Sequence, residues 1–217
     1  MADLFEGTGQ GAGEAVGPRG LGASAALAIV SQRQGSEMPH ALRGLGASAA
    51  PAMPRVDAIL HHLIFQRELA RVDALERDRA FCRHGLAHLL DVARVAWIRV
   101  LEDGLPLDRE LVYAAALLHD IGRAEQYASG VPHDVTGERI AAEILGTVGD
   151  GTRFPSSDER AILDAVRGHR VRSEGARRGQ LAEVVAWADK VSRPCFACPA
   201  RTACNWPDGR KNLSLRI

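Results

Sequence analysis

The sequence contains almost no lysine and carries no excess charge of either sign. Lys190 and Lys211 are the only lysines among 27 basic residues, and 27 acidic residues bring the formal net charge to zero. Proteins that bind nucleic acid or an anionic membrane surface usually carry a basic surplus or a basic run. We therefore expect neither nucleic acid nor a membrane among the partners of this chain.

Long apolar segments are missing as well. No run of about 18 apolar residues occurs, so the sequence offers no membrane-spanning helix. The weakly apolar segment from Leu21 to Val30 follows Asp3 and Glu6, where a signal peptide would carry basic residues. This pattern argues against secretion, and a cytoplasmic location is the expectation that remains.

Alternation of apolar and polar residues with a period of two, which is typical of a half-buried strand, is also missing. From Arg55 onward, apolar residues instead recur every three or four positions, which is the spacing of an amphipathic helix. Asp108 stands where it can cap the third of the resulting helices. We predict an all-α bundle with helices at about 55–75, 79–101, 109–121, 136–148, 156–169 and 180–191.

The composition divides the chain into three parts. Residues 1–52 are rich in Gly, Ala and Ser, and they contain Arg-Gly-Leu-Gly-Ala-Ser-Ala-Ala twice, at 19–26 and 43–50. A segment so poor in large apolar side chains does not build a core. We predict that residues 1–52 are a disordered leader or are not translated, that residues 53–192 form one folded domain, and that residues 193–217 form a cysteine-containing tail.

Five of the eight histidines lie in short polar motifs. His119 and Asp120 end an apolar run that begins at Ala114, so an imidazole and a carboxylate are expected at the end of a buried helix. Burying charge is costly unless a partner compensates for it, and a metal ion is a common partner. Further candidate ligands follow the same chemistry: His84 and His88, four residues apart on one predicted helix face, and then His133, His169 and Asp189.

The order His88, His119-Asp120, Asp189 resembles the H…HD…D signature of the HD phosphohydrolase superfamily. The resemblance covers residues 55–192 and implies an all-helical, metal-dependent phosphomonoesterase or phosphodiesterase. It implies a first metal site made of His88, His119, Asp120 and Asp189, and a second in which Asp120 joins His133 and His169. Imidazole and carboxylate ligands suit iron, manganese, cobalt or zinc. One or two such ions can activate water for attack on phosphorus.

His84 is a candidate general acid. The segment from His84 to Val92 is similar to a motif of cyclic-nucleotide phosphodiesterases, in which the first histidine protonates the leaving oxygen and the second binds metal. That similarity assigns proton donation to His84 and metal binding to His88, although Gly85 replaces the usual asparagine. The alternative is that His84 only satisfies a hydrogen bond in the core. The expected catalytic residues are therefore His84 and Asp120.

Basic side chains beside these motifs predict an anionic substrate. Arg123, Arg170, Arg172 and Lys190 could each hold a phosphate group by charge-assisted hydrogen bonds. We expect a small phosphate ester, with a nucleotide as the substrate class. The competing hypothesis is a non-catalytic module of the same fold that senses a nucleotide or a metal ion.

The four cysteines form a separate pattern. Cys195 and Cys198 make a Cys-x2-Cys pair, Cys204 follows six residues later, and Cys82 lies two residues before His84. This spacing is close to that of a structural zinc site, and it could also hold an iron–sulfur cluster. The tail also resembles the ends of uncharacterised HD-domain proteins. A metal site at these four cysteines is one hypothesis, and reduced, partly buried thiols are the other.

Overall fold

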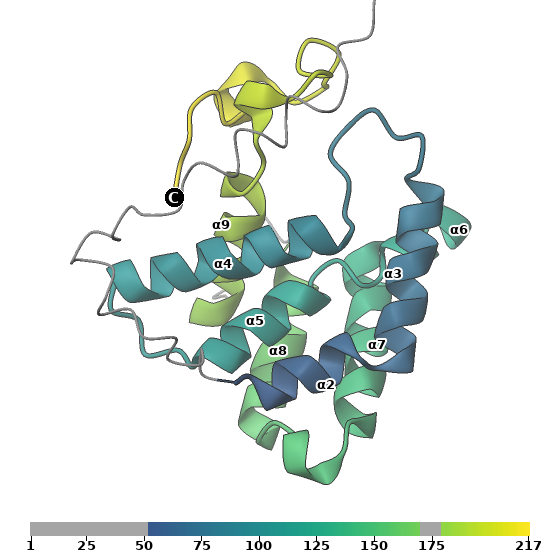
Figure 1. Ribbon diagram of the computed structural model, residues 1–217, viewed down its shortest axis with the longest axis vertical. Coiled ribbons are helices and arrows are strands. Elements are labelled where there is room, and N and C mark those ends of the chain that lie inside the picture. Colours follow the sequence, from purple (N-terminus) through teal and green to yellow (C-terminus); the bar gives the residue numbers. More distant parts are fainter. Residues whose placement is uncertain (1–51, 170–178) are drawn as a thin grey trace, which may run out of the picture. The chain divides into compact units, whose positions relative to one another are not determined.

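The computed structural model describes residues 52–169 and 179–217 (Figure 1). These residues form helices and contain no strand, which confirms the predicted all-α fold. None of the helices in the described ranges has both the length and the apolar character that crossing a bilayer requires. The helices are α2 (Pro54–Leu60), α3 (Leu63–Leu75), α4 (Leu86–Glu102), α5 (Arg109–Leu118), α6 (Arg123–Ser129), α7 (His133–Thr147), α8 (Ser156–Gly168) and α9 (Gln180–Val191), with short 3-10 helices at Asp150–Thr152, Cys195–Ala197 and Asp208–Arg210.

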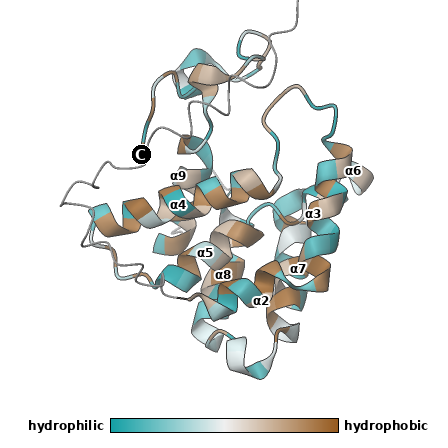
Figure 2. Ribbon diagram, viewed as in Figure 1, coloured by the Kyte–Doolittle hydropathy of each residue, from teal (hydrophilic) through white to brown (hydrophobic). Residues whose placement is uncertain are grey.

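Helix α5 lies at the centre of the bundle. Its residues from Ala114 to Leu118 are completely buried. Asp108 fixes the start of the helix, because its carboxylate accepts hydrogen bonds from the amides of Glu110 and Leu111. A helix that is apolar on every side must be covered on every side, and α2, α4, α8 and α9 pack against it. Figure 2 shows hydrophobic residues alternating with hydrophilic ones along these surrounding helices, as expected when each buries one side.

The packing of the outer helices brings several helix ends to one place. α7 packs against α8, α8 packs against α9, and α6 contacts both α3 and α7. As a result, the starts of α4 and α7 and the ends of α5, α8 and α9 carry side chains that meet in one region. The candidate site is therefore built from helix ends, where side chains can point along the helix axis toward a common centre.

The predicted helix at 55–75 is two helices. α2 ends at Leu60 and α3 begins at Leu63, because His62 adopts an extended conformation and its Nδ1 accepts a hydrogen bond from the Ile64 amide. The Nε2 atom of His62 lies 3.0 Å from Thr147 Oγ1. Apolar spacing continues through the break, yet Leu63 is 86% exposed. Periodicity alone therefore did not distinguish one helix from two.

The predicted helix at 79–101 begins later, at Leu86, after a loop of residues 76–85. The buried side chain of Glu76 explains the difference, because its Oε2 accepts a hydrogen bond of 2.6 Å from the His84 amide and removes that amide from helical pairing. The prediction that His84 and His88 share one helix face is thus wrong. The two rings still lie near each other, with centroids 5.9 Å apart.

Smaller differences occur near the predicted site. Helix α6 occupies a segment predicted to be a loop, and α7 begins at His133 and not at Thr136. Helix α9 spans the predicted residues. Residues 1–51 of the leader predicted at 1–52 lie outside the described residues, and so do Arg170 and Arg172, which were predicted to contact phosphate. The limits at 53–192 and 193–217 remain predictions.

Candidate metal centre

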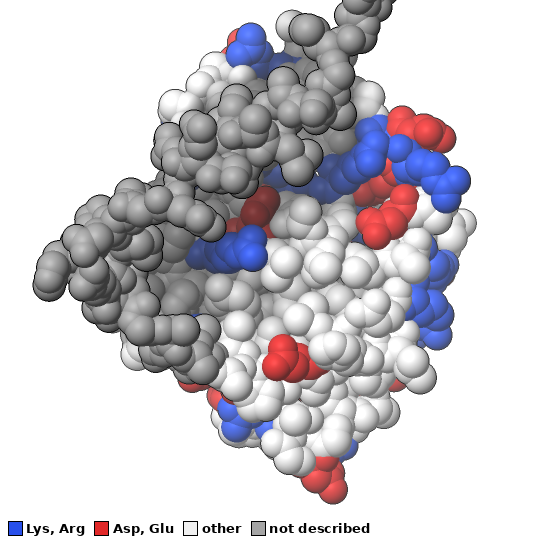
Figure 3. Space-filling view, in the orientation of Figure 1, with Lys and Arg blue, Asp and Glu red and all other residues white. Residues whose placement is uncertain are grey.

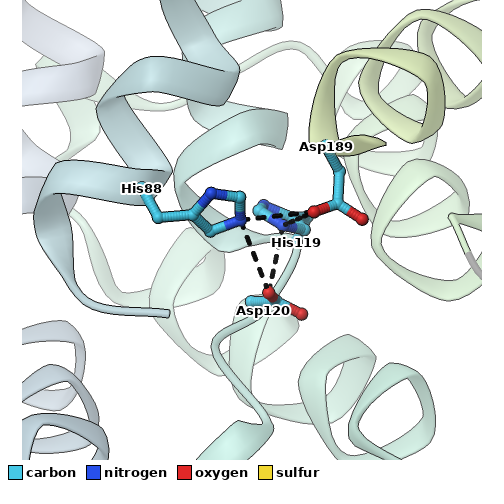
Figure 4. Close-up of side chains that lie close together, drawn as sticks. All are labelled: His88, His119, Asp120 and Asp189. Carbon is cyan, nitrogen blue, oxygen red and sulfur yellow. Dashed lines mark ion pairs between the residues drawn. The ribbon is translucent and has the colours of Figure 1, made fainter. Parts of the chain in front are cut away.

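Three helix ends bring four of the predicted ligands together. His88 lies in the first turn of α4, His119 is the C-cap of α5, Asp120 follows it directly, and Asp189 lies in the last turn of α9. Figure 4 shows their side chains pointing toward one common space. Their ring nitrogens and carboxylate oxygens lie within 4.8 Å of one another, which is close enough to hold one metal ion. We call these residues the first ligand group.

The distances within the first ligand group are short and mixed in chemistry. His119 Nε2 lies 3.2 Å from Asp120 Oδ2 and 3.8 Å from Asp189 Oδ1. His88 Nε2 lies 3.9 Å and 3.3 Å from the same two oxygens. Two imidazoles and two carboxylates form an environment that suits a divalent transition metal.

The second ligand group consists of Asp120, His133 and His169, whose donor atoms also lie within 4.8 Å of one another. His133 is the first residue of α7, and His169 is the C-cap of α8. Asp120 Oδ1 lies 3.0 Å from His133 Nε2 and 3.7 Å from His169 Nε2. The other oxygen, Oδ2, faces the first group. Asp120 thus stands between the two groups, in the position of a carboxylate that bridges two ions.

Carbonyl oxygens orient the histidine rings. The Nδ1 atoms of His119 and His169 donate to the backbone carbonyl three residues earlier, at 2.6 Å and 2.7 Å. The Nδ1 atom of His133 donates to the Gln126 side-chain oxygen. Because these oxygens only accept hydrogen bonds, each Nδ1 carries a proton, and each Nε2 presents a lone pair when its ring is neutral. Metal-binding histidines are commonly oriented by such bonds from the remote ring nitrogen.

Two of the donor atoms have no hydrogen-bond partner within the described residues. His119 Nε2 and Asp120 Oδ2 are buried there without a hydrogen bond, whereas most buried polar atoms in proteins have one. These two atoms lie 3.2 Å apart and face the same space as the other donors of the first ligand group. His133 Nε2 and His169 Nε2 lie 3.0 Å apart and both face Asp120 Oδ1. Both groups therefore fit metal ions.

The ligand groups combine charged carboxylates with neutral rings, apart from His119. Burial alone raises the pKa of Asp120 and of Asp189, but His119 and neighbouring groups outweigh it and hold both well below their usual range. Burial lowers the pKa of His88 to about 4 and that of His169 to about 3. Burial also lowers the pKa of His119, but the two carboxylates overcome this effect and raise the pKa to about 9. A metal ion that binds His119 would therefore take the place of its proton.

Two of the predicted phosphate-binding residues contact the ligand groups. Arg123 Nε donates to Asp120 Oδ1 at 3.0 Å. The Lys190 ammonium contacts Asp189 Oδ2. Both side chains also line the adjoining pocket, so the sequence correctly indicated that they lie beside the candidate metal centre. Their role in holding phosphate remains a prediction.

Arg193 is a buried arginine beside the first ligand group that the sequence motifs do not mark. One of its terminal nitrogens, Nη2, lies 2.8 Å from His88 Nε2 and 3.1 Å from Asp189 Oδ1. The guanidinium thereby offsets part of the charge of a buried carboxylate. Its position one helical turn after Asp189 is the signal that could have identified it.

A pocket of about 410 Å³ adjoins the first ligand group and is lined by Asp189 and His84. This volume lies within the range of small-ligand pockets. Among the described residues, six basic side chains line the pocket and Asp189 is the one carboxylate, although the net charge of the chain is zero. The basic residues are Arg79, Arg123, Lys190, Arg193, Arg201 and Lys211.

His84 lies in the wall of this pocket and is held there by Glu76. The Glu76 carboxylate lies 2.5 Å from His84 Nδ1 and also accepts hydrogen bonds from the His84 amide and the Tyr127 hydroxyl. Because Nδ1 is engaged, Nε2 is the ring nitrogen left to meet a ligand. Burial lowers the pKa of His84, and Glu76 opposes this effect. Nothing in the sequence around Glu76 marks it as different from its charged neighbours.

The four cysteines lie around the same pocket. Cys82, on the loop 76–85, lines it together with Cys195, Cys198 and Cys204 of the tail. All four are free thiols in the described structure. Among the described residues, the sets of three or more donor atoms that all lie within 4.8 Å of one another are the two ligand groups above, so no three of the sulfur atoms are gathered this closely. The structure brings the cysteines into one neighbourhood but not into a compact set of ligands.

Known proteins share this sequence pattern. Residues 85–193 match the family model of the HD domain, a range that contains both ligand groups. An uncharacterised protein of Clostridium beijerinckii is 36% identical over 163 residues, which is 75% of this chain and 99% of that protein. Ribonuclease Y of Clostridium botulinum is 27% identical over 145 residues, which is 63% of this chain but 27% of that protein.

The fold is also found in a solved structure. The crystal structure of a predicted HD superfamily hydrolase from an uncultured Thermotogales bacterium matches with a TM-score of 0.50 and 20% sequence identity. The match covers 69% of this chain and 80% of that chain. At this level of identity, the agreement shows a shared fold.

Proposed function

Because this chain belongs to the HD domain family, we propose that it is a metal-dependent hydrolase that cleaves a small phosphate ester, with a nucleotide as the substrate class. The observation that carries the proposal is the position of Asp120. Its two oxygens face two separate sets of histidine nitrogens, and one of those oxygens has no hydrogen-bond partner among the described residues. A metal ion in the first ligand group would give this unpartnered oxygen a ligand.

The two ligand groups would hold the ions. His88, His119, Asp120 and Asp189 would bind one divalent ion, and Asp120, His133 and His169 a second. Bound there, such ions supply a water of lowered pKa for attack on phosphorus and offset the charge that develops on the phosphoryl oxygens. The chain itself keeps the donor atoms in place through the carbonyl bonds to the histidine rings.

We assign proton donation to the leaving oxygen to His84. Its Nδ1 is held by Glu76, and its ring lies in the wall of the pocket beside His88. A carboxylate in this position fixes the ring orientation and stabilises the imidazolium form, as the aspartate of a catalytic triad does. Glu76 is thus a positioning residue that acts through His84.

The lining of the pocket supports an anionic substrate. The six basic side chains can form charge-assisted hydrogen bonds with phosphate oxygens. Figure 3 shows basic side chains gathered in a band on the upper part of the visible face, near the place where the loop between α3 and α4 runs in Figure 1. A volume of about 410 Å³ suits a small ester better than a long polymer. The similarity to ribonuclease Y supports a phosphodiester as one form of that ester.

Hydrolysis by the metal-loaded full chain tests this proposal. The chain would be loaded in turn with Mn²⁺, Fe²⁺, Co²⁺ and Zn²⁺ and assayed on p-nitrophenyl phosphate, bis-p-nitrophenyl phosphate, and a panel of mononucleotides and cyclic nucleotides. We expect Asp120→Asn to lower the rate by on the order of 100-fold or more, because both ligand groups lose the charge of their shared oxygens. Asp164→Asn is the matched control, since Asp164 is an exposed carboxylate on α8.

Two outcomes would overturn the proposal. If Asp120→Asn retained the full rate, the activity would not depend on the ligand groups. If small esters bound and stabilised the chain without being cleaved, a sensing module would be the better description. A short RNA is included as a control substrate, and cleavage of RNA alone would show that the substrate is not a small ester.

A further inference from the structure

The tail, residues 193–217, buries very little apolar surface. Within this described segment the buried residues are Arg193, Cys195 and Asn212, while Phe196, Leu213, Leu215 and Ile217 are exposed. Segments that cannot build a hydrophobic core of their own usually depend on disulfides, metals or strong hydrogen bonds. The tail therefore needs some attachment other than packing.

Hydrogen bonds already join the tail to the loop 76–85. Arg193 Nη1 donates to the Arg83 carbonyl oxygen at 3.0 Å. On the same loop, Arg79 Nε donates to the Cys82 carbonyl oxygen at 2.9 Å. The Asn212 amide donates to three carbonyl oxygens at the end of α9 and just beyond it, at 2.7, 3.1 and 2.9 Å. These bonds hold the backbone of Cys82 near the backbone of the tail.

The Cys-x2-Cys pair lies on a single turn. Residues Cys195–Ala197 form a 3-10 helix, and the Cys198 amide donates to the Cys195 carbonyl oxygen at 3.3 Å. Such a turn presents two sulfur atoms on the same side of the chain, as in metal-binding Cys-x2-Cys pairs. With Cys204 and Cys82 lining the same pocket, every cysteine of the chain is in this neighbourhood.

We propose that Cys82, Cys195, Cys198 and Cys204 ligate an iron–sulfur cluster that fastens the loop 76–85 to the tail and fixes one wall of the pocket. The separation of the sulfur atoms favours a cluster over a single zinc ion. Four sulfurs that bind one zinc ion at about 2.3 Å lie about 3.8 Å from one another. In a [4Fe–4S] cluster each thiolate binds a different iron, so the sulfurs stand farther apart, which fits a set in which no three sulfurs lie within 4.8 Å of one another.

The charged side chains around the cysteines are consistent with an iron–sulfur cluster. Burial raises the pKa of the Cys82 thiol, and the other three cysteines raise it further, while Arg193 opposes this effect. A thiolate-ligated cluster carries net negative charge, which Arg193 and the neighbouring Arg79, Arg201 and Lys211 would offset.

Acid-labile sulfide is the decisive measurement, because the histidine–aspartate groups can bind iron but cannot account for sulfide. The full chain would be produced with ample iron and purified without oxygen. We expect about two to four sulfides per chain and a broad visible absorption that dithionite bleaches. Cys198→Ser and Cys82→Ser should each lose most of both signals. His119→Ala should keep them, since it disrupts only the first ligand group.

The Cys82→Ser variant tests the structural part of the inference, because the tail motif alone does not involve Cys82. If this variant kept its full sulfide content, the proposed ligand set would be wrong. Wild-type chain without sulfide, even after reconstitution with iron and sulfide, would overturn the cluster. One zinc per chain, released when the thiols are modified, would do the same. None of these results depends on whether the chain hydrolyses phosphate esters.

Discussion

Glu76 is a buried carboxylate whose three hydrogen bonds tie the loop 76–85 to α6. Its partners are the amide and ring of His84 and the hydroxyl of Tyr127. Burial raises the pKa of Glu76, but the bonds from His84 and Tyr127 outweigh it and hold the pKa at about 2. Glu76→Gln removes the charge that these donors share. We expect it to lower the free energy of unfolding by on the order of 1–3 kcal/mol near neutral pH, measured by urea unfolding.

The pH dependence of the stability difference shows whether the charge of Glu76 or only its shape is responsible. The pKa of the Glu76 carboxyl falls from its usual 4.5 to about 2 on folding. Its charge therefore stabilises the folded state at pH values above the unfolded-state pKa, and this contribution is lost as the pH falls through the folded-state pKa. The stability gap between wild type and Glu76→Gln should therefore be constant above about pH 6 and shrink between about pH 5 and pH 2. Tyr127→Phe keeps the charge and should cost about 1 kcal/mol or less. A gap that did not change with pH would contradict the role of the charge.

At this scale the sequence indicates which histidines come together but not which residues support them. His119 and Asp120 interrupt an apolar run, and a polar pair at that position stands out from a helix pattern. Glu76 stands among other charged residues and gains its role only when the chain folds back to place His84 over it. Arg193 contacts His88 across 105 residues of sequence. Contacts between residues so far apart in sequence cannot be recognised from local composition or spacing.

Among the elements, the start of α6 lies close against the start of α7, and Gly122 permits this approach. A Cβ atom at position 122 would lie 2.2 Å from the His133 carbonyl oxygen and 2.6 Å from the Gly137 amide nitrogen. These are backbone atoms, so they cannot move aside as a flexible side chain would. We expect Gly122→Ala to lower the free energy of unfolding by about 1–3 kcal/mol or more. The same shift would draw His133 away from Asp120, so the metal content should fall as well.

Gly146→Ala is the matched control for this prediction. Gly146 is exposed on α7, and an added Cβ there meets nothing within 4 Å. Alanine favours the helix over glycine, so this variant should be more stable than wild type, by up to about 1 kcal/mol. Thermal unfolding of both variants, followed by circular dichroism, makes the comparison. If Gly122→Ala were as stable as Gly146→Ala, the contact would be less tight than the structure indicates.

The sequence predicts a helix well when most of that helix is buried. It predicts the ends of a helix poorly when a contact with a distant part of the chain decides them. Helix α5 is largely apolar from Leu111 onward and is capped by Asp108, so both its type and its start could be read from the chain. The break between α2 and α3 depends on His62, whose ring bonds to the chain at Ile64 and to Thr147 on α7. The late start of α4 depends on Glu76 in the same way. Periodicity does not report contacts of this kind.

At the scale of the whole molecule, the net charge is zero, but acidic and basic side chains lie in different places around the candidate site. Asp120 and Asp189 are buried at the meeting point of the helix ends, while basic side chains line the pocket beside them. Net charge therefore excluded a broad basic surface but could not show this local separation. Arg123, Lys190 and Arg193 pair with these two buried carboxylates, and a cation bound between the ligand groups would stabilise them further.

The stability of the whole chain should therefore depend on the metal concentration. An ion that binds the folded chain and not the unfolded one stabilises it by about 2.7 kcal/mol when present at 100 times its Kd. Mn²⁺ is the suitable probe, because it prefers carboxylate and imidazole ligands to thiolates and so reports the histidine–aspartate groups and not the cysteines. In urea unfolding of chelator-treated protein, added Mn²⁺ should raise the midpoint of wild type and of Asp164→Asn, and have little effect on Asp120→Asn. A wild-type midpoint that did not move with Mn²⁺ would mean that hydrogen bonds and the paired basic side chains alone hold the carboxylates, and the proposed metal centre would then be wrong.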